Sequence, residues 1–458
     1  MKHHPLAIAI LATLAAVPAL AQESQTAPTT RPDGSGGETL EPVATVDISR
    51  GGVGSRMWLG DLTGDGRYEI VMAQPDGGFN DAYFPHSVQA LTAFNLDGDV
   101  LWQVGKPTDD AGSGSDIPCQ LYDLDDDGNL DVIVAQEDEI RVYNGQTGEL
   151  KTSFPVPNEH AHDAILIADL AGDGHPSEIV LKDRYRQVWA MSETGDTLWT
   201  FQGNVGHYGW PYDLDGDGRD ELIFGYHVLS PDGEQLWEMD LEGHADAIWV
   251  ADVQPDHEGV EILVGGDGSY LYDARGNQLW AYENTVESQN AFPGDFRSDL
   301  PGLEIGGLDR IDRGDPGLDG LFLIDANANE LYKEERPVPG WSSIATVVRN
   351  FESSAGDLFL AYRRGGGLEP GLYDGRMARR YAFPASLEWA HFMYGDLVGN
   401  GRSQIIGYTL EPDADGKHLA HVFAADGAVD LAPSGQPRQQ PKRLYNWTRY
   451  WGSETPVE

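Results

Sequence analysis

The chain contains a single cysteine, Cys119, in 458 residues, so no disulfide can form within it. Lysine and arginine are also scarce: 30 of them stand against 75 aspartates and glutamates, which gives a formal net charge of −45. Such an excess of negative charge is repelled by phosphate backbones and by anionic membrane surfaces, so we expect no nucleic-acid partner. Stability must come from packing, with metal ions as a second source.

Beyond its N-terminus the chain has no apolar run long enough to cross a bilayer. The run from Leu6 to Leu20 follows a short basic start and ends at Ala19-Leu20-Ala21, which is typical of a signal peptide and its cleavage site. A membrane anchor is the alternative, although the run is short for one. We expect a secreted or periplasmic monomer without membrane insertion, divided into a signal peptide at 1–21, a disordered lead-in at 22–39 and a single propeller domain at 40–458.

Sustained helical periodicity is also missing, and a repeated strand pattern takes its place. An apolar run, an acidic residue, a loop rich in glycine and aspartate, and a second apolar run recur at Asp61, Asp123, Asp169, Asp213, Asp252, Asp295, Asn350 and Asp396. Most of these anchors are separated by roughly 40–50 residues, the length of a four-stranded propeller blade. Glycine turns flanked by alternating apolar residues, such as SPDGEQLW, supply the later strands of each unit.

Eight such units predict an all-β fold, an eight-bladed β-propeller with calcium loops after the inner strands. A seven-bladed ring is the alternative, because the unit at Asn350 is degenerate. The last unit is short of a fourth strand. We expect Pro42 to Ile48, near the start of the chain, to supply that strand and close the ring.

The loops after the inner strands carry carboxylates at alternate positions, which can converge on one hard cation. Two loops share the full pattern and two more share most of it, so we expect Ca²⁺ at Asp123, Asp125, Asp127 and Asp131; at Asp213, Asp215, Asp217 and Glu221; at Asp61, Asp65 and Glu69; and at Asp169, Asp173 and Glu178. Asp-Gly turns without any metal are the alternative, since such turns favour the same residues.

Propeller topology predicts which residues share a face of the disc. Residues just before an inner strand and residues in the loop between the second and third strands lie on one face, and the metal loops lie on the other. The first set includes His162, His207, Tyr208, His244, Asp246, Trp389 and His391, and the second includes His86, Lys182, Arg184, Tyr185, Arg310, Arg363 and Arg364. Any one histidine can be purely structural, but their recurrence at equivalent positions favours a site at the channel mouth.

These residue types suit β-elimination at a uronic acid, which needs a base, an acid and a cation beside the carboxylate. We expect His162 or His207 as the base. Tyr208 or Tyr185 would be the acid, and Lys182, Arg184 or a calcium ion would neutralise the carboxylate. The residues expected to bind substrate are His86, Trp210, His244, Asp246, Arg310, Arg363, Arg364, Trp389 and His391.

Two other functions stay open. Glycoside hydrolysis by the pair Asp163 and Asp246 is the competing reaction. A non-catalytic propeller that binds glycan or protein on the same face is the competing class of protein. No motif supports a nucleophilic serine or cysteine, or a zinc site built from thiolates.

The Asp-rich loop before Glu-Ile-Val resembles the FG-GAP repeats of integrin-type propellers. With KDRY at 182–185 and GHYGWPYDLDGDGRDE at 206–221, the chain resembles the propeller of rhamnogalacturonan lyases from about Arg50 onward. The resemblance implies calcium-dependent cleavage of a pectin backbone by elimination, and other uronate polymers, ulvan-like or glucuronan-like, stay open as substrates. The phrase LYDARGNQLW is also similar to quinoprotein propeller repeats, but no paired cysteines accompany it, so we expect no quinone cofactor.

Overall fold

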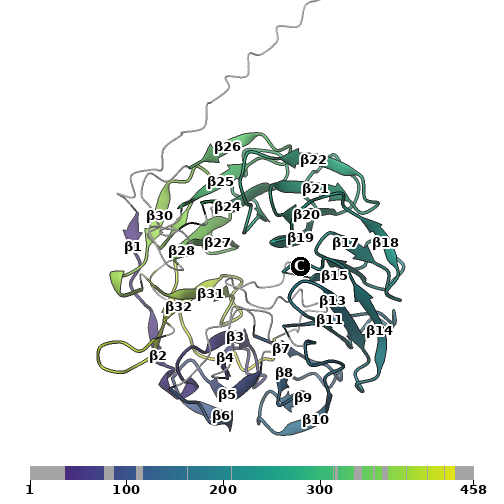
Figure 1. Cartoon of the computed structure of the whole chain (residues 1–458). Helices are drawn as coiled ribbons and strands as arrows, with labels where there is room; N and C mark the ends of the chain where they lie inside the picture. The colour runs from purple at the N-terminus through teal and green to yellow at the C-terminus, as the bar shows by residue number, and fades with distance from the viewer. Residues whose placement is uncertain are drawn as a thin grey trace, which may run out of the picture.

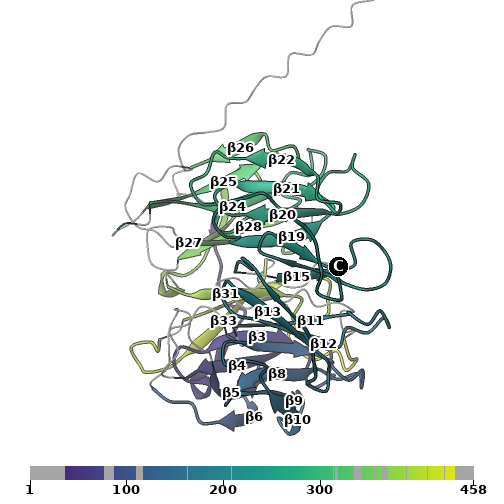
Figure 2. The same cartoon turned by 45° about the vertical axis from the view of Figure 1, so that its right-hand side comes forward.

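The structure is a computed structural model that describes residues 37–76, 87–109, 117–161, 163–207, 209–312, 314, 318–334, 343–353, 356–363, 370–387, 389–409, 411–425, 427 and 429–438. Within these residues, eight β-sheets are arranged in a ring about a common axis, as Figure 1 shows. Figure 2, turned by 45°, shows the same sheets standing side by side as blades of a disc. The predicted eight-bladed propeller is confirmed, and the seven-bladed alternative is wrong.

Each of the first four blades contains four consecutive antiparallel strands. The first blade comprises β3 (Arg56–Gly60), β4 (Glu69–Pro75), β5 (Val88–Phe94) and β6 (Val100–Gly105). The second comprises β7 (Cys119–Tyr122), β8 (Asp131–Gln136), β9 (Glu139–Asn144) and β10 (Leu150–Pro155). The third comprises β11 (Ala164–Ala168), β12 (Glu178–Lys182), β13 (Gln187–Met191) and β14 (Thr197–Gln202), and the fourth comprises β15 (Gly209–Tyr212), β16 (Glu221–Phe224), β17 (His227–Leu229) and β18 (Gln235–Glu238).

The remaining blades follow the same plan, with additions from the N-terminus. The fifth comprises β19 (Ala247–Ala251), β20 (Glu261–Gly265), β21 (Ser269–Asp273) and β22 (Gln278–Tyr282), and the sixth comprises β23 (Phe292–Gly294), β24 (Glu304–Asp312), β25 (Leu318–Ile324) and β26 (Glu330–Lys333). The seventh comprises β27 (Ser343–Val348), β28 (Leu358–Arg363), β29 (Gly371–Tyr373) and β30 (Arg379–Ala382), with β1 (Glu38–Thr39) at its edge. The eighth comprises β31 (His391–Gly395), β32 (Gln404–Tyr408), β33 (Leu419–Phe423) and β2 (Ala44–Asp47). Two short 3-10 helices are η1 (Ser49–Gly51) and η2 (Ala385–Leu387).

Burial decreases from the axis to the rim of each blade. In the third blade every residue of the inner strand β11 is buried, whereas the outer strand β14 is mostly exposed. Neighbouring blades cover both faces of an inner strand, which explains its continuous apolar sequence. The hydrophobic core is accordingly a chain of clusters that join each blade to the next around the ring.

A tryptophan of the outer strand packs against the next blade in the first, third and fourth blades. Trp102, at the end of the first blade, packs over the turn glycine Gly148 of the second, where an added Cβ would lie 2.7 Å from the indole. Its indole N–H also donates to the carbonyl of Gly145 at 2.7 Å. The pairs Trp199 with Gly233 and Trp237 with Gly276 repeat the contact further along the ring. These turns need glycine for two reasons: their φ angles are positive, and a side chain at these positions would collide with the indole ring of the tryptophan.

The ring is closed by strand β2, as the sequence predicted for Pro42 to Ile48. β2 pairs antiparallel with β33, in the register Ala44 with Val422 and Asp47 with Leu419. Closure by the chain start therefore completes the sheet that the last three strands begin. The end of the expected lead-in is also ordered, because Glu38 and Thr39 form β1 along the edge of β30.

The C-terminal segment strengthens the same seam. The backbone N–H of Arg438 donates to Asp61 of the first blade at 2.9 Å, and its guanidinium group lies 4.7 Å from the ring of Tyr68. The guanidinium also donates to the carbonyl of Asp396 in the eighth blade. One residue thus joins the first and last blades.

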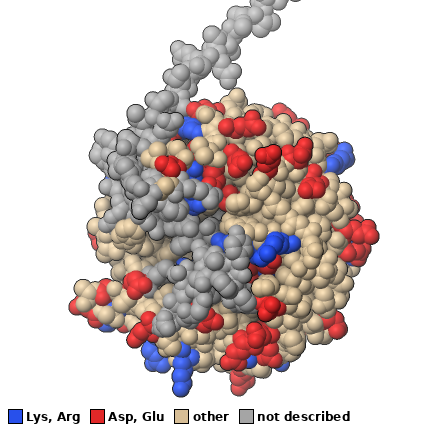
Figure 3. Space-filling view, in the orientation of Figure 1, with Lys and Arg blue, Asp and Glu red and all other residues tan. Residues whose placement is uncertain are grey.

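The surface matches the composition. Figure 3 shows aspartate and glutamate side chains spread around the rim of the visible face, with few lysines and arginines among them. Salt in the medium screens the repulsion between such charges. None of the helices in the described part of the chain is long and apolar enough to cross a membrane.

A buried acidic residue closes the loop after most inner strands. Glu69, Glu178, Glu221, Glu261 and Glu304 each begin the second strand of their blade, and each accepts one or two backbone N–H groups from the loop before it. In the eighth blade Gln404 makes the same bond, from the N–H of Leu397 at 2.9 Å. The bond therefore needs an acceptor oxygen at this position but does not need a charge.

Glu304 provides a test of this point through pH. Burial raises the pKa of Glu304 to about 7. The folded state therefore holds a proton that the unfolded chain has lost, and stability falls as the pH rises from about 5 through 7. We expect Glu304→Gln to remove its share of this fall, on the order of 3 kcal/mol. Urea unfolding at several pH values, with chelator present, measures it.

The comparison isolates Glu304, because the other buried glutamates are the same in both proteins. Parallel pH profiles for the wild type and Glu304→Gln would contradict the assignment.

Candidate active site

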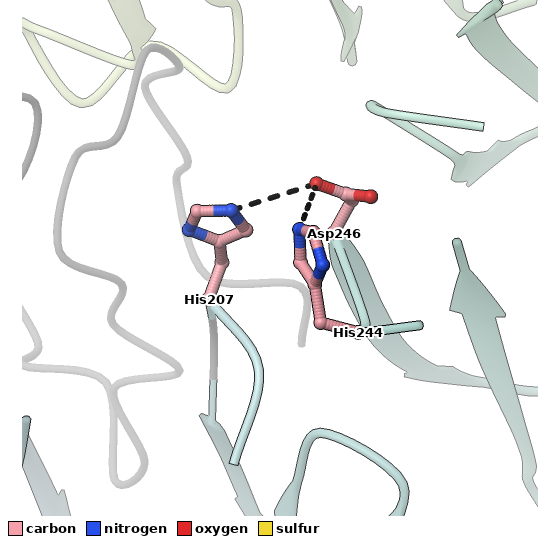
Figure 4. A group of neighbouring side chains, drawn as sticks. All are labelled: His207, His244 and Asp246. Atoms are coloured by element: carbon pink, nitrogen blue, oxygen red, sulfur yellow. Dashed lines mark ion pairs between the residues drawn. The ribbon is translucent and has the colours of Figure 1, made fainter. Parts of the chain in front are cut away.

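Three side chains from the loops before two neighbouring inner strands meet at one mouth of the ring. His207 precedes β15, and His244 and Asp246 precede β19. As Figure 4 shows, the imidazoles converge on Asp246: the Nε2 atoms of His207 and His244 lie 3.5 and 3.4 Å from its Oδ1. One ligand atom from each residue lies within 4.8 Å of the others, a spacing that a single metal ion can span. We refer to these three residues as the His-His-Asp cluster.

Backbone contacts hold the two loops at this distance. The N–H of His207 donates to the carbonyl of Ala245 at 3.0 Å, and the N–H of Asp246 donates to the carbonyl of Gly265 at 2.8 Å. Gly206 permits the approach, because its φ is +58° and an added Cβ would lie 2.9 Å from the Ala245 oxygen. The glycine in the phrase Gly206-His207 is therefore part of how the cluster is built.

Tyr185, from the loop between β12 and β13 of the third blade, contacts both histidines. Its hydroxyl lies 3.0 Å from Nε2 of His207, and its ring meets the imidazoles of His207 and His244 edge-on at 5.0 and 5.1 Å. The guanidinium of Arg184 lies 5.7 Å from the same ring. Residues that precede the inner strands and residues in the loop between the second and third strands thus lie on the same face of the disc, as propeller topology predicted.

A buried layer of charge pairs supports the cluster. Lys182 is 0 % exposed; its Nζ lies 3.3 Å from Asp163 and donates to the carbonyl of Arg184 at 3.0 Å. On the other side, Gln289 donates to Asp246 at 3.1 Å. Its amide also lies 3.4 Å from Glu287, which pairs with Arg310 at 3.7 Å. Lys182 and Arg310 are therefore each accompanied by a carboxylate.

Electrostatics keep His207 neutral. Its burial, together with the nearby charges of Arg184, His244 and Lys182, lowers its pKa well below the ordinary value, and Asp163 opposes this only in part. At neutral pH the imidazole therefore carries no charge. A neutral imidazole is the form that can bind a metal ion or accept a proton.

The structure corrects two of the expected roles. Trp210 is 1 % exposed and packs in the core against Trp249, with ring centroids 5.4 Å apart, so its face is not available to a sugar. Lys182 lies beneath the site and is enclosed by its own partners, so it positions Arg184 and Asp163 and does not reach a substrate carboxylate. Both errors have one cause: the pattern places a residue on a strand but does not reveal its depth.

The other expected residues lie in three situations. Arg310 belongs to the buried layer of charge pairs beneath the cluster, through its pair with Glu287. Trp389 and His391 come from the eighth blade, which Figure 1 places across the ring from β19. Trp389 is 54 % exposed, and His391 is nearly buried beside Tyr362 and Tyr408. The expectations for His86, His162, Tyr208 and Arg364 lie outside the described residues, and Arg363 is described only in its backbone.

Sequence reasoning missed Glu287 and gave no role to Gln289. Their position in the sequence was a usable indication, since Gln289 lies close before the inner strand β23 and Glu287 is two residues earlier on the same segment. Neither residue type stands out without the contacts to Asp246 and Arg310.

The predicted metal loops fall into two groups. Three carboxylates come within 4.8 Å of one another at Asp123, Asp125 and Asp127 and again at Asp213, Asp215 and Glu221. The loops at Asp61 and Asp169, which are fully described, form no such group. In all four loops the first aspartate accepts backbone N–H groups from its own turn, as a turn without metal would also require.

The fold and the site define an eight-bladed β-propeller with a site of two histidines and an aspartate at one mouth of the ring. The model of the rhamnogalacturonan lyase family 11 C-terminal domain matches residues 178–315, and that of an FG-GAP-like repeat matches residues 123–181. Every member of the His-His-Asp cluster lies in the first match, and so do Arg184, Tyr185, Gln289 and Arg310.

Two curated relatives from Bacillus subtilis (strain 168) are similar to the chain. It is 24 % identical over 348 residues to the rhamnogalacturonan exolyase YesX, covering 61 % of this chain and 56 % of the relative. It is 24 % identical over 315 residues to the rhamnogalacturonan endolyase YesW, covering 54 % and 50 %. The chain spans about half the length of the curated relatives that it matches.

Solved structures share the fold. A rhamnogalacturonan lyase PL11 from Bacillus licheniformis superposes with a TM-score of 0.59 at 16 % identity, over 91 % of this chain and 81 % of that one. The biofilm matrix protein Bap1 of V. cholerae superposes with a TM-score of 0.54 at 13 % identity, over 92 % of each chain. The same architecture therefore occurs in proteins with different names, so the site must carry the argument about function.

Proposed function

We propose that the protein is an exported polysaccharide lyase that cleaves a uronic-acid-containing polymer, rhamnogalacturonan or a related chain, by β-elimination. The observation that carries the proposal is the position of the His-His-Asp cluster and its arginine and tyrosine neighbours inside the segment that the rhamnogalacturonan lyase model matches. The names of the two curated relatives agree with it. Export rests on the signal-like residues 1–21.

Elimination makes three demands on a site. The proton beside the uronate carboxylate must be removed, the charge that develops on that carboxylate must be neutralised, and the leaving oxygen must be protonated. Cations and a proton donor therefore have to surround one sugar unit. Arginine is well suited to the second demand, because its planar group binds a carboxylate at two points.

We assign His207, His244 and Asp246 to holding a divalent cation. The spacing fits one ion, and His207 is 3 % exposed, which suits a ligand better than a base that must touch the sugar. Gln289 bonds to Asp246 and fixes the orientation of its carboxylate. Such an ion, when bound, would supply positive charge to the carboxylate of the substrate.

Tyr185 and Arg184 are the proposed reacting neighbours. Tyr185 is half-buried beside the cluster, and its hydroxyl can protonate the leaving oxygen. Arg184, next to its ring, would share the substrate carboxylate with the ion. His162 stays the expected base. Trp389, exposed on the eighth blade, is the remaining candidate for stacking on a sugar ring.

Calcium is also proposed for the loop of the fourth blade, on the opposite face. Asp213, Asp215 and Glu221 present oxygen atoms within 4.8 Å of one another, and calcium prefers oxygen ligands. The ion would fasten the first strand of the blade to the second. Calcium in the loops at Asp61 and Asp169 stays a prediction from their sequence.

The reaction can be tested with a panel of uronate polymers. The purified protein should release products with the ultraviolet absorbance of an unsaturated uronate, from rhamnogalacturonan first of all, and chelation should reduce the rate. New reducing ends without that absorbance would indicate hydrolysis by Asp163 and Asp246 instead. Binding of polymer without any new ends would leave a non-catalytic propeller, and either outcome would refute the lyase.

A further inference from the structure

Two loops with the same spacing of carboxylates differ in whether a lysine side chain lies among those carboxylates. The loop of the second blade begins at Asp123 and that of the fourth at Asp213, and the sequence predicts calcium in both. In the second blade a lysine from the outer strand β10, Lys151, reaches this group of acids. Its Nζ lies 2.7 Å from Asp125, 3.2 Å from Asp127 and 2.9 Å from Asp131.

These contacts use three of the four acidic side chains that were expected to bind the metal. Asp131 is buried and the side chain of Lys151 is mostly covered, so this pair is shielded from water, whereas Asp125 and Asp127 are exposed. Burial alone would lower the pKa of Lys151, but its hydrogen bonds to the three carboxylates outweigh burial and raise the pKa above its ordinary value. The ammonium group therefore remains charged and balances part of the acidic group.

The position of Lys151 in the repeat shows that the lysine is specific to this blade. Between the third and fourth strands of each of the first seven blades, the pairing skips one residue of the fourth strand. Lys151 is the skipped residue of the second blade. Five other blades have leucine there, namely Leu101, Leu198, Leu236, Leu279 and Leu331, and the seventh has Arg380.

The seventh blade offers a parallel. Its loop, at Asn350, lacks the acidic pattern, and Arg380 bonds to Glu352 at 3.2 Å. The fourth blade, with the loop that gathers Asp213, Asp215 and Glu221, has Leu236 at the equivalent position, and its side chain is exposed. A long cation at the skipped position thus reaches an acidic residue of the loop in both blades that have one.

We propose that Lys151 is a built-in cation that takes the place of calcium in the second blade, so that the loop at Asp123 closes without a metal ion. The prediction of calcium there assumed that the carboxylates face one another across an open centre. The comparison with the fourth blade rests on the calcium proposed for that blade. The loops of the second and fourth blades then share one spacing of carboxylates and differ in the cation, which is the lysine ammonium group in the second blade and calcium in the fourth.

The test counts calcium ions per chain by equilibrium dialysis in the full-length protein and in single variants. Lys151→Leu, which introduces the residue of five other blades, should gain one ion. Leu236→Lys, the reciprocal change, should lose one. Asp125→Asn should leave the wild-type count unchanged, while Asp215→Asn should lower it by one. In chelator, Lys151→Leu should melt at a lower temperature than the wild type. Added calcium should remove this difference in melting temperature.

An unchanged count in Lys151→Leu, or a lower count in Asp125→Asn, overturns the inference whatever happens at Asp215. A gained ion in Lys151→Leu together with no loss in Asp215→Asn supports the inference and instead overturns the calcium proposed for the fourth blade. Asp125→Asn changes only an exposed side chain, so it tests the loop even if the lysine variants fold poorly.

Discussion

Replacing His207 by alanine is expected to lower turnover on a uronate polymer by about 10²–10³-fold, the usual effect of removing one group that stabilises developing charge. The reason is the geometry of the His-His-Asp cluster: His207 supplies one of its three ligand atoms, and its ring packs edge-on against that of Tyr185. The variant would therefore lose both the proposed ion and the position of the proposed acid. Initial rates at saturating polymer, with calcium, manganese and zinc added separately, measure the loss.

Two further readouts separate a role in the reaction from a role in folding. The midpoint of thermal unfolding should change far less than the rate, because the backbone bond from His207 to Ala245, which holds the two loops together, is kept. Metal bound per chain should fall by one. His160→Ala is the matched control, since this histidine also precedes an inner strand, β11, but is exposed and outside the cluster. Equal rates for His207→Ala and the wild type would rule out the assignment.

The positioning role of Gln289 predicts a smaller effect at the same site. Gln289→Leu keeps the size of the side chain and removes the bond to Asp246, so we expect a loss of about 10-fold to 100-fold in metal affinity. Added metal should then rescue its rate, which it should not do for His207→Ala. Failure of metal to rescue Gln289→Leu would show that this residue acts in another way.

The fold could be predicted because its information is repeated. Each blade carries its own acidic anchor, apolar runs and glycine turn, so an error in one unit, such as the degenerate one at Asn350, does not change the count. Even the closing strand was predictable, since the final unit lacked one strand and the N-terminus contained one without a partner. Because the pattern is repeated, the architecture could be predicted from a single sequence.

The site was predictable only in part, because chemistry there depends on depth and on contacts between blades. Topology correctly brought Tyr185 of the third blade to His207 of the fourth. It could not show that Trp210 turns into the core or that Lys182 is enclosed by Asp163 and Arg184. Nor could loop spacing alone distinguish the second blade from the fourth, since Lys151 lies 20 residues after Asp131 and approaches from another strand.

Val46→Asp is expected to cause the largest loss of stability, about 4 kcal/mol or more, the range for a charge buried without a partner. Val46 lies in β2 and is fully buried in the cluster that joins the eighth blade to the first. Because β2 is the only strand of its blade that comes from the start of the chain, its loss would open the ring and expose the edge of β33. The midpoint of urea unfolding measures the effect.

Thr45→Asp is the matched control for the closing strand. It places the same carboxylate one residue earlier, where the side chain points outward and meets His421 of β33 at 3.0 Å. The register of β2 against β33 joins residues about 376 positions apart, so this strand fixes the two ends of the chain to each other. If closure holds the ring together, Val46→Asp should also make β33 and its neighbours accessible to protease, while Thr45→Asp should not. Equal protease resistance in the two variants would mean that the ring keeps its shape through the blade contacts alone, with the Arg438 segment as the remaining link across the seam.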